Sequence, residues 1–269
     1  MPLDDRAGHG THWQSWGHGP RPALAVHCML GHSGPWGLIG EALGAQITLT
    51  GFDLPGHGKS APWAGESEAG GYQKLATQVA ASFIDRPIDL IGHSFGALVA
   101  LRLAVAAPQA IRTLTLIEPV LFAAVRGTPD WDAVWPGQAQ LEAMLAEGRA
   151  EEAARAFMAD WGAGVPWEAM PPAQRARFTE QMGVVQAVTA ANFADPGNIL
   201  REDGLEGIDA PVLIIRGETS PAIIAPVCEA IAARLPDVGL AVVPGAGHML
   251  PLTHARQTAE LIALNLERQ

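Results

Sequence analysis

The stretch DLIGHSFGALVA, residues 89–100, passes from a short apolar run through Gly92 and Gly96 into a run of small, helix-forming residues. Ser94 lies between the two glycines, so the pattern is Gly-x-Ser-x-Gly at a predicted strand-to-helix junction. Such a junction places the serine on a turn so tight that the flanking positions must be glycine, and it pushes the hydroxyl out above the carboxyl ends of the strands. We therefore expect Ser94 to be a nucleophile. The alternative interpretation is an ordinary turn bounded by glycines.

Short runs of β-type residues recur on both sides of this stretch and are bounded by Gly, Pro or Asp. They are residues 11–16, 23–27, 47–53, 88–93, 113–118, 211–217 and 239–245. Helix-like windows lie between or after them, at residues 72–84, 97–107, 226–235 and 258–267. This alternation predicts an α/β fold with a mostly parallel sheet covered on both faces, because the later strands are apolar without alternation.

The alternation stops between residues 119 and 210. This segment contains helical windows at 138–148, 151–161 and 173–193, no convincing strand, and an unusual share of large apolar residues. We predict a helical cap at residues 119–210, inserted into a core formed by residues 1–118 and 211–269. A cap packed over the nucleophile must offer part of its surface to a substrate, so we expect Trp131 and Trp161 to contact a largely apolar substrate.

Charge and composition exclude several classes of partner. The formal net charge is −11 and only 17 Lys and Arg residues are scattered along the chain, which argues against nucleic acid. The start MPLDDRAGHG lacks a signal-peptide pattern, and no apolar stretch is long enough to span a membrane. We expect a soluble, cytoplasmic monomer or homodimer acting on a small molecule, with Cys28 and Cys228 as free thiols.

The motifs together resemble the α/β-hydrolase-fold enzymes along nearly the whole chain. The resemblance rests on the strand 23–27, the loop DLPGHGKS at 53–60, GHSFG at 92–96 and the late PGAGHMLP at 244–251. It implies Ser94 as nucleophile and His248 as general base, because a serine hydroxyl needs an imidazole to take its proton. His254 is the competing histidine, and His248 is favoured because it follows a late strand and a glycine-rich turn.

The acid of the expected triad departs from the family pattern. The resemblance would place an aspartate at the fourth position of Gly217-Glu-Thr-Ser220, where this chain has Ser220. Three alternatives stay open: Glu118 at the end of the strand 113–118, Glu218 in the usual turn, or a Ser-His dyad without an acid. We favour Glu118, because catalytic residues gather at strand ends in open α/β sheets. Glu118 as a purely structural carboxylate is the competing interpretation.

The resemblance also implies an oxyanion hole formed by the backbone N–H groups of Phe95 and Met29. The family loop usually begins His-Gly, whereas this loop begins with His27 and Cys28. His27, Cys28 and His32 have no fourth ligand at a suitable spacing, so we expect no metal. We expect His32 to contact a polar end of the substrate.

The function expected from these residues is hydrolysis of a carboxylic ester through an acyl-enzyme, with thioesters and lactones as close variants. No cofactor is expected, since PGHGKS lacks the first glycine of a phosphate-binding loop: Asp53 stands there. Two alternatives remain. One is a carbon-carbon bond hydrolase or lyase that uses the same serine and histidine. The other is a non-catalytic small-molecule binder on the same scaffold.

Overall fold

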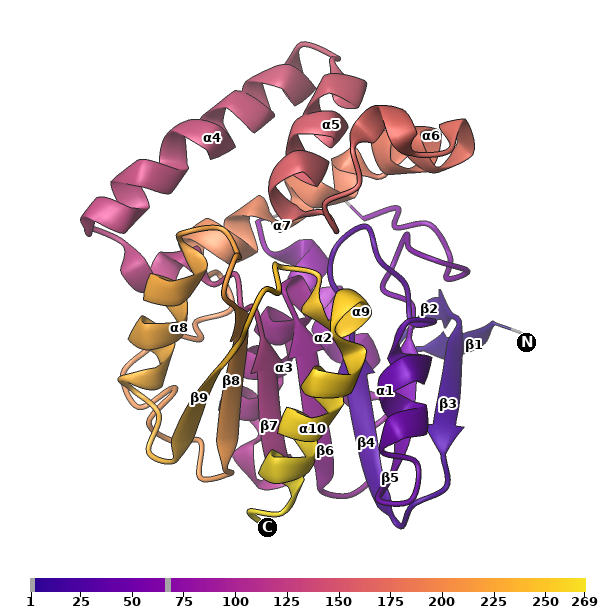
Figure 1. Ribbon diagram of the computed structural model, residues 1–269, viewed down its shortest axis with the longest axis vertical. Helices are drawn as coiled ribbons and strands as arrows, with labels where there is room; N and C mark the ends of the chain where they lie inside the picture. The colour runs from indigo at the N-terminus through magenta and orange to yellow at the C-terminus, as the bar shows by residue number, and fades with distance from the viewer. Residues whose placement is uncertain (1–2, 66–68) are drawn as a thin grey trace.

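A computed structural model of the chain describes residues 3–65 and 69–269. The predicted core range includes residues 1–2 and 66–68, which lie outside the described residues. The centre of the molecule is a seven-stranded sheet (Figure 1). In sheet order its strands are β3 (Trp13–Gly17), β5 (Ile47–Phe52), β4 (Arg21–Val26), β6 (Ile88–His93), β7 (Ile111–Ile117), β8 (Val212–Gly217) and β9 (Val238–Val243). Only β3 pairs antiparallel with its neighbour, so the prediction of a mostly parallel sheet is confirmed.

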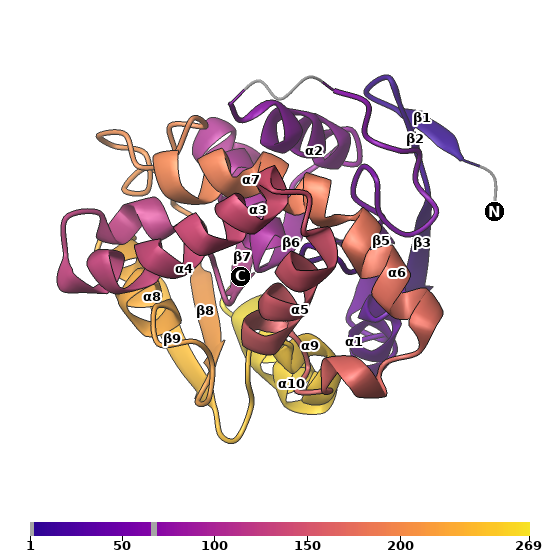
Figure 2. The ribbon, with the colours of Figure 1, turned by 90° about the horizontal axis from the view of Figure 1, so that it is seen from above.

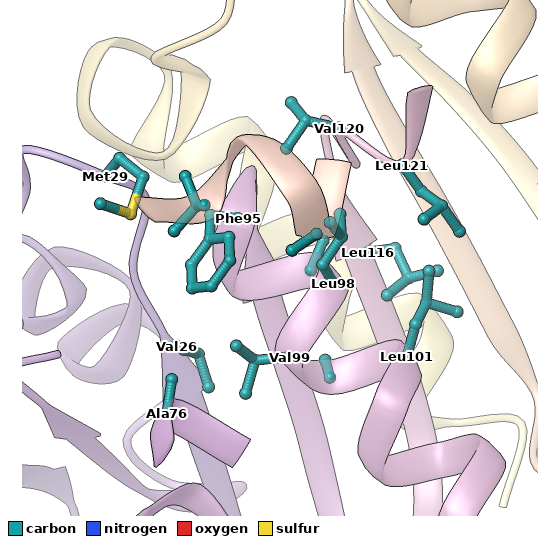
Figure 3. Packing of buried hydrophobic residues seen from close by; sticks show 14 of the residues in the cluster. Val26, Met29, Ala76, Phe95, Leu98, Val99, Leu101, Leu116, Val120 and Leu121 are labelled. Atoms are coloured by element: carbon teal, nitrogen blue, oxygen red, sulfur yellow. The ribbon is translucent and has the colours of Figure 1, made fainter. Parts of the chain in front are cut away.

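Helices cover both faces of the sheet, and each face has its own hydrophobic cluster. One face is covered by α1 (Trp36–Ala42) and α10 (Ala255–Leu266), which contact each other. The other is covered by α2 (Gly71–Ala81), α3 (Phe95–Ala106) and α8 (Ile224–Ala232). Figure 3 shows Leu98, Val99 and Leu101 of α3 among the buried side chains on that second face. Every residue of β6 is buried, without alternation, as expected of a strand that is covered on both faces.

Short elements complete the core. The hairpin of β1 (Asp4–Arg6) and β2 (His9–Thr11) precedes β3, and α9 (Leu250–Thr253) precedes α10. Three single-turn 3₁₀ helices are η1 (Pro108–Ala110), η2 (Phe122–Val125) and η3 (Trp167–Ala169). The strand predicted at residues 11–16 is wrong in its start: β2 ends at Thr11 and β3 begins at Trp13. The strand is interrupted at His12, whose backbone N–H donates to Ser60 Oγ instead of to a neighbouring strand.

Four helices lie between β7 and β8 and stand over the carboxyl end of the sheet (Figures 1 and 2). They are α4 (Pro129–Ala146), α5 (Ala150–Trp161), α6 (Pro172–Glu180) and α7 (Met182–Ala194). We propose that this insertion, residues 119–210, acts as the cap. The single helical window predicted at 173–193 is divided at Gln181, whose side chain donates to the Gly56 carbonyl of the core.

Two further expectations concern cysteines and membranes. Cys28 and Cys228 are both free and buried, as predicted. Across residues 3–65 and 69–269, no helix combines the length and the apolar character needed to cross a bilayer.

Candidate active site

Ser94 occupies the sharp turn between β6 and α3. Its backbone has φ 56° and ψ −118°, a region that residues with a side chain rarely adopt. The turn is held because the Ser94 N–H donates to the Ile117 carbonyl of the neighbouring strand β7, at 2.8 Å. The strain is therefore balanced by a bond to the sheet, and Ser94 is placed at the N-terminus of α3.

The two glycines of the turn are required by close approach of the backbone. A Cβ on Gly96 would lie 2.1 Å from the Val26 carbonyl oxygen, and a Cβ on Gly92 would lie 2.4 Å from the Gly96 carbonyl oxygen. Neither contact is possible for a real side chain. The glycines let α3 pack directly against the ends of β4 and β6.

We expect Gly96→Ala to lower the free energy of unfolding by at least about 2 kcal/mol, because the added methyl collides with backbone atoms that cannot move independently. Gly183→Ala is the matched control: it lies on α7 with no atom within 4 Å of its would-be Cβ. That change should be neutral or stabilising by about 0.5–1 kcal/mol. Urea denaturation of both variants measures the difference. Equal stability of the two variants would contradict the steric argument.

His248 and Glu118 form a buried pair beside the turn. His248 Nδ1 lies 2.9 Å from Glu118 Oε2, and the two side chains are 3% and 0% exposed. The carboxylate can only accept, so Nδ1 carries a hydrogen, and in the neutral imidazole Nε2 is then the nitrogen with the lone pair. The imidazole therefore has the tautomer that a general base requires.

Glu118 is held by three donors. Its Oε1 accepts from the Gly217 N–H at 2.6 Å and from the Ser220 hydroxyl at 2.7 Å, while Oε2 accepts from His248. These bonds compensate the burial of the carboxylate. Ser220, at the position where the resemblance led us to expect an aspartate, thus donates to the carboxylate of Glu118.

The competing residues of the sequence lie elsewhere. Glu218 is exposed, and its Oε2 accepts from the Gly245 N–H at 2.8 Å. His254 contacts the Thr253 hydroxyl at the start of α10 and does not line the cavity described below. Of the two carboxylates left open by the sequence, Glu118 and Glu218, only Glu118 makes a hydrogen bond to His248 among the described residues.

A cavity of about 870 Å³ connects the predicted residues. Ser94, His248, Met29 and Phe95 all line it. Within the described part of the chain, no hydrogen bond joins Ser94 Oγ to the His248 ring. Such bonds are often long in free enzymes and shorten when substrate binds.

Met29 and Phe95 offer two amide donors to this cavity. Phe95 is the first residue of α3, so its N–H has no partner within the helix. Neither the Phe95 N–H nor the Met29 N–H has an acceptor among the described residues. Two unpaired N–H groups at the lining of one cavity are suited to an oxyanion.

A model of the alpha/beta hydrolase family matches residues 9–261. The chain belongs to the alpha/beta hydrolase family. The hydrolase is 29% identical over 274 residues to the pimeloyl-[acyl-carrier protein] methyl ester esterase of Methylococcus capsulatus, covering 94% of this chain and 97% of that one. Among solved structures, a hydrolase from Pseudomonas aeruginosa superposes with a TM-score of 0.73 at 22% identity, covering 99% of this chain and 97% of that one. An alpha/beta hydrolase from Sphaerobacter thermophilus gives a TM-score of 0.70 at 22% identity, covering 97% and 99%. These two likenesses concern the fold alone.

Aromatic side chains of the insertion 119–210 extend from His248 along the cavity of the hydrolase. The Trp161 ring meets the His248 ring edge-on, with centroids 4.8 Å apart. The Phe122 ring centroid lies 5.9 Å from that of Trp161 and 4.9 Å from that of Phe193. All three residues line the cavity. This row makes an apolar wall that continues from His248 toward α7.

The predicted contact between Trp131 and a substrate stays a prediction, and the structure shows how Trp131 packs. Trp131 does not line the cavity. Its ring is stacked on Trp135 with centroids 5.6 Å apart, packs edge-on against Phe193, and is covered by Arg126 at 5.4 Å. It lies behind Phe193 because α4 begins at Pro129, capped by Thr128, well before the window predicted from the sequence.

His32 and His93 flank the site from different elements: His32 lies in the loop after β4, and His93 is the last residue of β6. His32 is exposed at the cavity lining, and its Nδ1 accepts from the Gly34 N–H at 3.1 Å. His93, which the sequence analysis gave no role, donates Nε2–H to the His248 carbonyl at 2.9 Å. Burial lowers the pKa of His93 well below its usual value, so the ring stays neutral 5.2 Å from the His248 ring. The sequence could have indicated that His93 lies at the site, since it directly precedes Ser94 in the Gly-x-Ser-x-Gly motif.

Proposed function

We propose that this hydrolase cleaves carboxylic esters through an acyl-enzyme on Ser94. The observation that carries the proposal is the 2.9 Å bond between His248 Nδ1 and Glu118 Oε2, beside a strained turn that presents Ser94 to the same cavity. The name of the Methylococcus capsulatus relative, an esterase, supports ester chemistry. Family membership supports a hydrolase in general.

The proposed reaction assigns each residue one role. His248 Nε2 takes the proton of Ser94 Oγ as the oxygen attacks the ester carbonyl, and Glu118 stabilises the imidazolium that forms. The N–H groups of Phe95 and Met29 bind the negative oxygen of the tetrahedral intermediate. His248 then gives the proton to the leaving alcohol, and water, activated in the same way, releases the acid from Ser94.

The substrate we propose is an uncharged ester with a largely apolar acyl group. The aromatic row of Trp161, Phe122 and Phe193 supplies the apolar wall. The cap segment 119–210 holds 14 Asp and Glu residues against six Arg residues, so its field disfavours anionic substrates. His32 is proposed to contact a polar end of the substrate at the exposed edge of the cavity.

A fluorophosphonate probe tests the proposed chemistry directly. We expect covalent labelling of the wild-type protein and none of Ser94→Ala, measured by intact-protein mass spectrometry. Absence of labelling in well-folded wild-type protein would favour the non-catalytic binder. Turnover of diketones in preference to esters would favour the carbon-carbon bond hydrolase.

A series of 4-nitrophenyl esters of increasing acyl length is expected to show an optimum in kcat/KM, because the cavity has a finite apolar wall. Esters of equal length that end in a carboxylate should have kcat/KM at least about tenfold lower at low salt, owing to the acidic cap. Added salt should narrow that difference by screening. A preference for the anionic esters would contradict the proposed substrate class.

A further inference from the structure

The loop after β4 holds one peptide group whose direction matters for an oxyanion hole: the group that joins Cys28 to Met29. Its oxygen, Cys28 O, accepts from His27 Nδ1 at 2.6 Å and from the Gly31 N–H at 3.2 Å. A trans peptide is planar, so its C=O and N–H point in opposite directions. Bonds that hold the Cys28 oxygen therefore also determine where the Met29 N–H points.

The next peptide group of the same loop, which joins Met29 to Leu30, is held by a residue of a different loop. The Leu30 N–H donates to His57 Nε2 at 3.1 Å. Leu30 has φ 59°, a left-handed conformation that is unfavourable for a leucine and needs support from its surroundings. His57 belongs to the loop 53–60, and its Nδ1 donates to the Pro55 carbonyl at 3.0 Å. Met29 thus lies between two peptide groups, each bonded to a histidine.

Each of the two histidines accepts a hydrogen bond from the backbone of the other histidine's loop. His27, from the loop that carries Met29, accepts at Nε2 from the Leu54 N–H at 2.9 Å. His57, from the other loop, accepts from Leu30 in return. The ring centroids are 5.4 Å apart and both side chains are buried. The loops are therefore tied to each other in both directions.

Each ring must be neutral to make these bonds. Both accept at Nε2 from a backbone N–H, so both carry their hydrogen on Nδ1 and donate it to a carbonyl. Burial lowers the pKa of His27 to about 3 and that of His57 to about 4. Near neutral pH both rings are therefore neutral, and the hydrogen bonds of His27 and His57 to the two loops can all form.

We propose that His27 and His57 are positioning residues that together aim the Met29 N–H at the oxyanion of the tetrahedral intermediate. The proposal rests on the function proposed above. It gives His57 a role in the chemistry although His57 itself does not line the cavity. It also leaves no ring nitrogen of His27 free for a metal ion, because both are bonded to the backbone.

A matched pair of substitutions separates the two nitrogens of His57. His57→Gln places an amide oxygen near the position of Nε2 and keeps an acceptor for the Leu30 N–H. His57→Asn keeps a polar group near Nδ1 but is too short to reach Leu30. We expect His57→Asn to lower kcat about 30-fold or more with KM changed less than about threefold, and His57→Gln to recover at least about tenfold of that loss.

Inhibitor binding supplies a readout that a merely structural role would not change. An alkyl trifluoromethyl ketone forms a tetrahedral adduct with the serine, whereas the matching alkyl methyl ketone binds only as an uncharged ligand. For His57→Asn we expect the affinity for the trifluoromethyl ketone to fall in parallel with kcat and the affinity for the methyl ketone to stay the same. Equal losses for both ketones would overturn the proposal, and so would an unchanged kcat.

Tyr72→Phe is the control for stability. The Tyr72 hydroxyl donates to the same Pro55 carbonyl at 2.8 Å and lies 3.2 Å from His57 Nδ1. Its removal therefore disturbs the Nδ1 side of the same buried cluster, while the bond from the Leu30 N–H to His57 Nε2 stays. We expect a lower Tm with kcat within about twofold of wild type. A loss of kcat in Tyr72→Phe equal to that in His57→Asn would overturn the positioning role. Failure of the proposed function is a separate outcome, because it would appear as wild-type protein that the fluorophosphonate does not label or as turnover that survives Ser94→Ala.

Discussion

Replacement of Ser94 by alanine is expected to lower kcat for ester hydrolysis by about 10⁴-fold or more, because the attacking oxygen and the covalent intermediate are both lost. The strained turn should survive, since its glycines and the bond from the Ser94 N–H to Ile117 do not involve the side chain. Initial rates with a short 4-nitrophenyl ester, together with the rate of fluorophosphonate labelling, measure the effect.

Ser15→Ala is the matched control for this change. Ser15 is an exposed residue of the edge strand β3, and among the described residues its hydroxyl is hydrogen-bonded only to the Thr50 hydroxyl. Rates for that variant should equal those of the wild type. If Ser94→Ala kept more than about a hundredth of the wild-type kcat, the ester would be attacked by a water molecule that His248 activates directly, and the acyl-enzyme would be excluded.

Glu118→Gln is expected to lower kcat by about 10³- to 10⁴-fold, because an amide of the same size cannot balance the charge of the His248 imidazolium and disturbs its tautomer. Glu218→Gln is the same chemical change at an exposed position bonded to the Gly245 N–H. It should change kcat less than about threefold. A large effect of Glu218→Gln with little effect of Glu118→Gln would assign the acid to the family's usual turn.

Ser220 allows a sharper version of this test. Ser220 Oγ lies 2.7 Å from Glu118 Oε1, so an aspartate at this position would place a second carboxylate next to the first. In the wild-type background we expect Ser220→Asp to lower kcat through repulsion between the two carboxylates. In the Glu118→Gln background the same change should restore at least about tenfold, because it supplies the missing charge. Absence of any rescue would contradict a purely electrostatic role for the acid.

Helix α1 illustrates a limit of prediction from sequence. Its segment WGLIGEA contains Gly37 and Gly40, which lower the intrinsic tendency to form a helix, and no helix was predicted there. In the fold these glycines lie against Trp16 of β3: a Cβ on Gly40 would be 2.7 Å from the Trp16 side chain. The glycines serve a packing contact with a residue about 20 positions earlier, which local propensity cannot reveal.

Trp131 illustrates a second limit. The segment 119–210 is rich in aromatic residues, and for that reason the sequence indicated that Trp131 contacts the substrate. The structure places it behind Phe193, packed on Trp135. Which aromatic residues of a helical insertion face the core site depends on the rotation of each helix, and α4 is nearly uniform in its hydrophobic pattern around its axis.

The sequence by itself determined the α/β class, the turn that carries Ser94 and the order of serine and histidine along the chain. The turn depends on residues within a few positions of one another, where glycine requirements and strand-to-helix junctions act locally. The fold class follows from the alternation of such local patterns along the chain, and the order of serine and histidine is read directly from the sequence. Only the tertiary structure decided which acid meets His248, because Glu118 and His248 are 130 residues apart and Ser220 had to converge on the same carboxylate. It also decided the exchange of bonds between His27 and His57, since that contact exists only when two loops from neighbouring strands lie side by side at one edge of the sheet.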